Sequence, residues 1–117
     1  MSRAVDYRYA CVVVEWRDGD TLVVDVDLGF RLTFRQAVRV CGIDTPERHG
    51  STKEAGDRAK AFAESLAPVG TELLIQSRKP DRPAEKYGRW LATVTLPDGS
   101  DLAMRMLAAG HAVAYFG

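Results

Sequence analysis

The strongest constraint on the fold is a short stretch of alternating residues at positions 21–28. Apolar side chains occupy every second position of this stretch, and Asp25 and Asp27 lie between them. Successive side chains of a strand point to opposite faces, so the pattern predicts an antiparallel strand with one face in the core and one in water. Asp18-Gly19 before the stretch and Gly29 after it are typical of the turns that end such strands.

The rest of the chain predicts further strands and two helices. The predicted strands are 7–16, 21–28, 31–43, 71–77 and 87–96, the predicted helices are 51–66 and 101–110, and a short apolar segment follows at 113–116. The third strand is long, so we expect it to bend or bulge. The first helix begins with a predicted capping box, Ser51 with Glu54, and carries an apolar stripe at helical spacing. Five short strands with an inserted helix favour a small α+β fold, mainly β, that forms a partly open barrel of the OB type.

Length and apolar content bound the organisation of the chain. With 117 residues, 46% of them hydrophobic, we expect a single domain over residues 1–117 with one core. No apolar run approaches the roughly 18 residues of a membrane span, so we expect no membrane segment. The N-terminus lacks the basic and apolar pattern of a signal peptide, which predicts a cytoplasmic protein, or a secreted one if a signal has been removed.

The charge of the chain excludes a globally basic nucleic-acid-binding protein. The 16 basic and 16 acidic residues give no net charge, so the chain is not a globally basic nucleic-acid binder. However, 12 of the 16 basic residues are Arg, whose rigid fork of donors suits phosphate.

Cys11 and Cys41 lie in apolar, strand-like runs, which favours two free thiols and leaves one disulfide open. No Cys/His cluster occurs, so we expect no zinc site.

Two carboxylates are candidates for a metal site. Asp20 ends the first predicted turn and Asp44 ends the third predicted strand. If the second and third strands pair around Gly29, these side chains converge at one end of the sheet. Two carboxylates with backbone carbonyls and water suit Ca²⁺ or Mg²⁺. Taken alone, each aspartate could equally serve only its own turn or loop.

Two arginines are candidates for binding a phosphate group. Arg39 lies five positions before Asp44 among apolar neighbours, where it is costly unless it is paired. Arg89 lies between Tyr87 and Trp90. Two guanidinium groups near a carboxylate-bound cation would grip a phosphodiester and stabilise the charge that builds during displacement. Taken alone, each could be an ordinary arginine on a strand surface.

Three segments together resemble the staphylococcal nuclease (thermonuclease) family. They are DGDT at 18–21, VRVCGIDTPE at 38–47 and KYGR at 86–89, and the resemblance extends over about 12–115. It implies an OB-fold barrel and Ca²⁺-dependent hydrolysis of DNA and RNA. The nucleic acid would be a substrate, cut by in-line attack of water to leave 3′-phosphate ends.

The resemblance also implies a role for each matching residue. The implied metal ligands are Asp20, Asp44 and the carbonyl of Thr45. The implied catalytic residues are Arg39 and Arg89, as phosphate clamps, and Glu47, which orients or deprotonates the attacking water. The implied substrate contacts are Tyr87 and, after a one-residue gap, Tyr115.

An alternative function and two oligomeric states remain open at this point. Some OB-fold modules of this kind are catalytically silent and bind nucleic acid or a protein, but they have lost the acidic and arginine residues. All of these residues are present here, which favours an enzyme. The chain ends just after Tyr115, where similar proteins often have another helix, so we expect either a monomeric minimal barrel or a homodimer.

Overall fold

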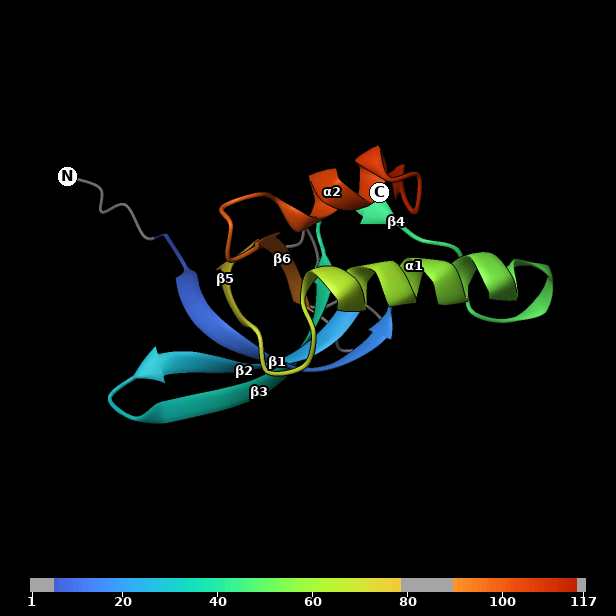
Figure 1. Cartoon of the computed structure of the whole chain (residues 1–117). Helices are drawn as coiled ribbons and strands as arrows, with labels where there is room; N and C mark the ends of the chain where they lie inside the picture. The colour runs from blue at the N-terminus through green and yellow to red at the C-terminus, as the bar shows by residue number, and fades with distance from the viewer. Residues whose placement is uncertain (1–5, 79–89, 116–117) are drawn as a thin grey trace.

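The structure is a computed structural model that describes residues 6–78 and 90–115. Within these residues five strands form a closed barrel in the order β1-β2-β3-β6-β5, and two short strands form a second sheet (Figure 1). The elements are β1 (Arg8–Asp18), β2 (Thr21–Gly29), β3 (Leu32–Val40), β4 (Ile43–Asp44), the 3₁₀ turn η1 (Gly50–Thr52), α1 (Lys53–Leu66), β5 (Glu72–Ser77), β6 (Trp90–Thr95), α2 (Leu102–Ala108) and β7 (Val113–Ala114). The predicted five-stranded barrel of the OB type, with one helix after the third strand and a short helix near the C-terminus, is confirmed, but the barrel is closed and not partly open.

The alternating stretch forms β2, and its inner face belongs to the core. Leu22 and Val24 are fully buried and Val26 is nearly so. Leu28 was expected to face the core as well, but 44% of it is exposed. The reason is that β1 pairs with β2 only as far as Val26, so the end of the hairpin extends past the barrel wall.

The hairpin of β2 and β3 brings the first turn next to the end of the third strand. The two strands are antiparallel, with Thr21 opposite Arg39. Just before Thr21, the carbonyl of Asp20 accepts a 2.8 Å hydrogen bond from the backbone nitrogen of Val40. The pairing of strands therefore fixes the distance in space between Asp20 and the end of β3.

The predicted third strand, 31–43, is interrupted after Val40. Gly42 has a φ of 89°, which glycine adopts readily, and the chain turns there before β4 begins. β4 then leaves the barrel and pairs with β7, with Asp44 opposite Val113. The expected bend is therefore a full break, and it places Asp44 beside the C-terminal segment.

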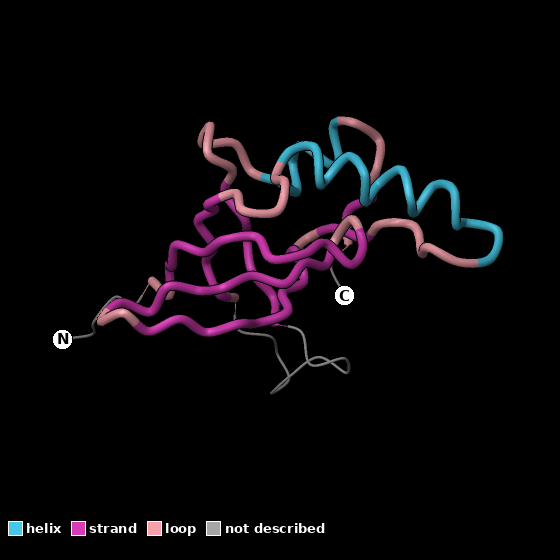
Figure 2. The backbone as a smooth tube through the Cα atoms, turned by 60° about the horizontal axis from the view of Figure 1, so that its bottom comes forward, coloured by secondary structure: helices cyan, strands magenta, loops and turns pink. Residues whose placement is uncertain are grey.

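The helices lie together on one side of the strands (Figure 2). α1 begins at Lys53, and its N-cap is Thr52 with no side-chain capping bond, so the predicted capping box is wrong. The apolar stripe is confirmed, since Ala59 and Ala63 are fully buried. α2 is capped as predicted by Asp101, whose side chain accepts a hydrogen bond from a backbone nitrogen of the helix. No helix in the described ranges has the length and apolar character needed to cross a membrane.

Both cysteines are free thiols, and they differ in accessibility. Cys11 is 1% exposed in the core, whereas Cys41 is partly exposed. Burial, with the Glu72 carboxylate as a smaller cause, raises the pKa of the Cys11 thiol from 9.0 to about 11.

We expect alkylation of the native protein to modify Cys41 and to spare Cys11. The thiolate is the reactive form, and with the raised pKa only roughly one Cys11 in a thousand is ionised at pH 8. Mass spectrometry after iodoacetamide treatment, with and without denaturant, measures both sites. Equal labelling of the two cysteines in the native protein would contradict the burial of Cys11.

Candidate functional site

A pocket of about 500 Å³ opens where the turn before β2, the end of β3, β4 and the loop after β4 meet. Five of the residues predicted to form a site line this pocket: Asp20, Arg39, Asp44, Thr45 and Glu47. Tyr115 does not line the pocket, but its ring contacts the guanidinium of Arg39, which does. The remaining two predicted residues, Tyr87 and Arg89, lie outside the described residues. The pocket therefore brings together residues that are far apart along the chain.

Asp20 is the buried acid of the site. Its carboxylate oxygen Oδ2 accepts a hydrogen bond of 3.2 Å from the backbone nitrogen of Thr45, and Oδ1 accepts one of 3.0 Å from the hydroxyl of Thr21. The side chain is only 9% exposed. Since a buried carboxylate is costly without such donors, these contacts hold Asp20 in one orientation and fix Thr45 next to it.

Arg39 lies between the two predicted metal-binding acids. Its Nη2 atom is 3.5 Å from Oδ2 of Asp20 and 3.2 Å from Oδ1 of Asp44. The side chain is 11% exposed, and its guanidinium carbon lies 5.1 Å from the centre of the Tyr115 ring. That distance is within the range of a cation–π contact. The partners that the sequence required for this arginine are therefore two carboxylates and an aromatic face.

The other two acids of the site face solvent. The side chain of Asp44 is 52% exposed and that of Glu47 is 77% exposed. Oε2 of Glu47 is 2.9 Å from Nε2 of His49, a residue to which sequence reasoning gave no role. The site thus combines one fixed, buried acid with two acids that an incoming ligand can reach.

Arg48 is a second residue that sequence reasoning missed. Its Nε donates to Oδ1 of Asp57 on α1 at 2.9 Å, and its Nη1 donates to the carbonyl of Arg17 at the end of β1 at 2.8 Å. Hydrogen bonds from Lys53 and, to a lesser degree, from Arg48 hold the pKa of Asp57 below its usual value. Arg48 therefore ties the loop that carries Glu47 to two other elements. A charged residue in a polar loop gives no local signal of such a role.

The two carboxylates Asp20 and Asp44 are the kind of ligand that a hard divalent cation takes. Over residues 6–78 and 90–115 no group of three or more His, Cys, Asp or Glu side chains is arranged to hold a metal. A cation here would use the carboxylates of Asp20 and Asp44 and the carbonyl of Thr45, with water or ligand oxygens completing its shell. This donor set contains neither nitrogen nor sulfur, which suits Ca²⁺ or Mg²⁺ rather than a transition metal.

Comparison with known proteins shows similarity to a relative and to a protein family. The chain is 32% identical over 116 aligned residues to an uncharacterized lipoprotein of Mycoplasma genitalium. This alignment covers 86% of the chain but only 43% of that relative, so the chain spans less than half of the relative's length. A family model described as staphylococcal nuclease homologue matches residues 37–117, which include Arg39, Asp44, Thr45 and Glu47. With more than half of its length matched by this model, the chain belongs to the family of staphylococcal nuclease homologues.

Proposed function

We propose that this chain is a Ca²⁺-dependent nuclease that hydrolyses phosphodiester bonds of DNA and RNA. Family membership by itself supports a nuclease-like or nucleic-acid-binding OB-fold domain. The observation that carries the finer proposal is the placement of the Arg39 guanidinium against both Asp20 and Asp44 in one pocket. A phosphate-binding fork and a set of hard oxygen ligands then act at the same point.

Each of these pocket residues would have its own role in phosphodiester hydrolysis. Asp20, Asp44 and the Thr45 carbonyl would hold Ca²⁺, which when bound supplies positive charge against the phosphate. Arg39 donates to the phosphate oxygens and stabilises the negative charge that grows on them during displacement. Glu47 orients a water molecule and takes its proton as the water oxygen attacks phosphorus. The bond to the 5′ oxygen breaks, that oxygen takes a proton from solvent water, and a 3′-phosphate end remains, while Glu47 returns its proton to solvent.

The resemblance supplies the roles that we propose for the remaining residues. Arg89 would be the second phosphate clamp, and Tyr87 would contact the substrate. Residues 1–117 would act as one domain, as a monomer or a homodimer, which analytical ultracentrifugation would decide. The roles of Arg89 and Tyr87 rest on the match to KYGR, and not on contacts in the structure.

Tyr115 has a contact that allows its ring and its hydroxyl to be tested separately. We expect Tyr115→Leu to lower kcat about two- to fivefold, because it removes the aromatic face beside Arg39. Tyr115→Phe keeps that face and removes only the hydroxyl that would contact the substrate. It should therefore raise KM while leaving kcat within about twofold. If kcat of Tyr115→Phe fell as far as that of Tyr115→Leu, the role of the ring would be refuted.

One experiment separates the nuclease from its alternatives. Plasmid and single-stranded DNA are incubated with the protein in Ca²⁺ and, in parallel, with a chelator. A nuclease releases fragments with 3′-phosphate ends only in Ca²⁺. A catalytically silent module retains DNA in a binding assay and leaves it intact. A metal that serves stability alone lowers the melting temperature on chelation, with neither cleavage nor binding.

The description of the relative supports a proposal about the cellular location of this protein. It is described as a lipoprotein, a class of proteins held at a membrane by a lipid anchor. We therefore propose that this domain acts outside the cytoplasm, which is the second of the two locations that the sequence left open. Fractionation of cells that express the full protein, followed by detection of this domain, tests the proposal. Recovery in the cytoplasmic fraction would contradict it.

A further inference from the structure

The loop that carries Glu47 lies unusually close to helix α1. A Cβ atom placed on Gly56 would lie 2.6 Å from the carbonyl oxygen of Glu47 and 2.8 Å from the carbonyl oxygen of Pro46. Both are backbone atoms, which cannot move aside as the end of a flexible side chain can. Gly56 therefore lets α1 and this loop approach to a distance that no other residue permits.

The reason for a glycine at this position is space and not backbone conformation. Gly56 lies inside α1 and is not among the glycines with positive φ. Glycine in a helix interior costs stability relative to alanine, so an open position would favour alanine. The next turn of α1 shows the same close packing, since a Cβ on Gly19 would lie 3.0 Å from Cβ of Ala59 and 3.1 Å from Cγ2 of Thr45.

The backbone of Glu47 is held from more than one direction, whereas its carboxylate is not. The hydroxyl of Thr52 donates to the Glu47 carbonyl at 2.8 Å, and the neighbouring Arg48 is bonded to Asp57. The side chain of Glu47 is 77% exposed, and its Oε2 atom lies 2.9 Å from Nε2 of His49, a residue of the same loop. The place of the carboxylate in the pocket therefore follows from the place of its backbone.

We propose that Gly56 is a positioning residue that sets the location of the Glu47 carboxylate by admitting the loop against α1. This inference rests on the proposed function for the part that concerns catalysis. A side chain at position 56 would push the Pro46–Glu47 backbone away from α1. A shift of about 1 Å in a group that orients water is enough to cost up to a hundredfold in rate.

The test is a cycle of variants built on Gly56→Ala and Glu47→Gln. We expect Gly56→Ala to lower kcat about 10- to 100-fold, with KM and Ca²⁺ affinity within about threefold of wild type. In the Glu47→Gln background, Gly56→Ala should lower kcat by less than about threefold, because the carboxylate that the alanine would misplace is absent. The inference is overturned if Gly56→Ala keeps kcat within twofold, or if it costs the same factor in both backgrounds.

A second measurement is independent of catalysis. In an open helix interior, Gly→Ala raises the folding equilibrium constant about fivefold. The matched control Ala61→Gly, at an exposed position of α1, should lower it by about that factor. We expect Gly56→Ala to lower it as well, and to shift the amide resonances of residues 45–49. If Gly56→Ala does not fold, Thr52→Ala replaces it in the cycle, with an expected loss in kcat of about threefold that vanishes in Glu47→Gln.

The two measurements distinguish the ways in which the account can fail. If the wild type does not cleave nucleic acid in Ca²⁺, the proposed function fails, and the folding equilibrium and the amide shifts still decide whether Gly56 places the loop. A rise in stability for Gly56→Ala, with unshifted amides at 45–49, overturns the inference whatever the activity.

Discussion

Replacement of Arg39 by lysine is expected to lower kcat about a hundredfold or more. The guanidinium is held by Asp20, Asp44 and the Tyr115 ring, so its fork presents a fixed direction to the pocket. Lysine keeps the charge, but a point charge cannot form the two parallel hydrogen bonds that a transition-state phosphate accepts from arginine. Steady-state kinetics at saturating single-stranded DNA measure the effect, with thermal melts to show that the fold survives.

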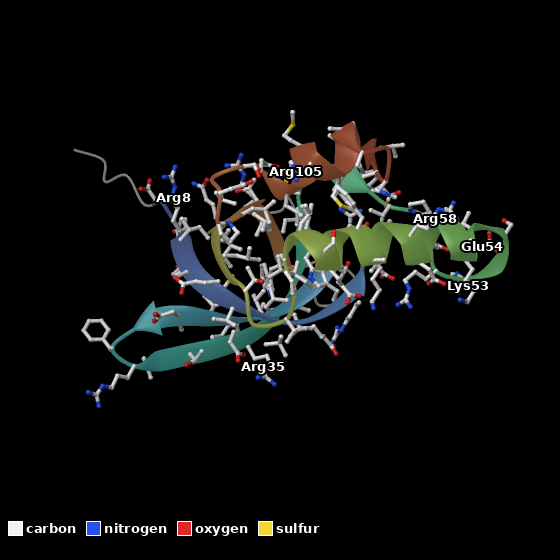
Figure 3. The ribbon with its side chains drawn as sticks, viewed as in Figure 1. Arg8, Arg35, Lys53, Glu54, Arg58 and Arg105 are labelled. Atoms are coloured by element: carbon white, nitrogen blue, oxygen red, sulfur yellow. The ribbon has the colours of Figure 1, made fainter. Side chains whose placement is uncertain are left out.

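A matched control lies on the same strand. Arg35 on β3 points away from the barrel and pairs with Asp25 at the surface, with an Nε–Oδ1 distance of 2.8 Å (Figure 3). We expect Arg35→Lys to leave kcat within about twofold. Near wild-type turnover in Arg39→Lys would refute the phosphate clamp. The same substitution at Arg89 extends the test to the second proposed clamp.

Loss of either aspartate is expected to weaken Ca²⁺ binding by at least tenfold. Isothermal titration of Asp20→Ala and Asp44→Ala against wild type measures the affinity, and unchanged affinity in both variants would refute the assignment. The two variants should differ in stability. Asp20→Ala leaves the buried backbone nitrogen of Thr45 without the carboxylate that accepts its hydrogen bond, at a cost of about 1–3 kcal/mol. Asp44 is half exposed, so its loss should change the free energy of unfolding by less than about 1 kcal/mol.

The barrel could be predicted because its signals are local. The alternation at 21–28 and the flanking glycines specify a hairpin without knowledge of the rest of the fold. The break after Val40 could not be predicted, since β4 is stabilised by pairing with β7, which lies far along the chain. The capping box failed for a related reason. The turn before α1 is occupied by contacts to the Glu47 loop, such as the bond from Thr52, which exist only in the folded chain.

Part of the candidate site could likewise be predicted from the sequence, and part of it could not. The approach of Asp20 to the end of β3 follows from hairpin register, which the sequence pattern specifies. The contacts of Arg48 and Gly56 depend on which surface of α1 meets the loop, and no local pattern encodes that surface. Glycine inside a helix was the one available signal, because its cost in stability implies a compensating reason.

The most direct test of the account is the single-turnover cleavage rate of a 5′-labelled single-stranded oligonucleotide across Ca²⁺ concentrations. Wild type is compared with Glu47→Gln and with the control Glu54→Gln, which changes an exposed acid in the first turn of α1, away from the pocket (Figure 3). The account predicts cleavage by wild type and Glu54→Gln that saturates with Ca²⁺ and stops with a chelator. Glu47→Gln should be at least a hundredfold slower at every concentration. Cleavage that persists in chelator, or equal rates in Glu47→Gln and wild type, would contradict a Ca²⁺-dependent nuclease at this site.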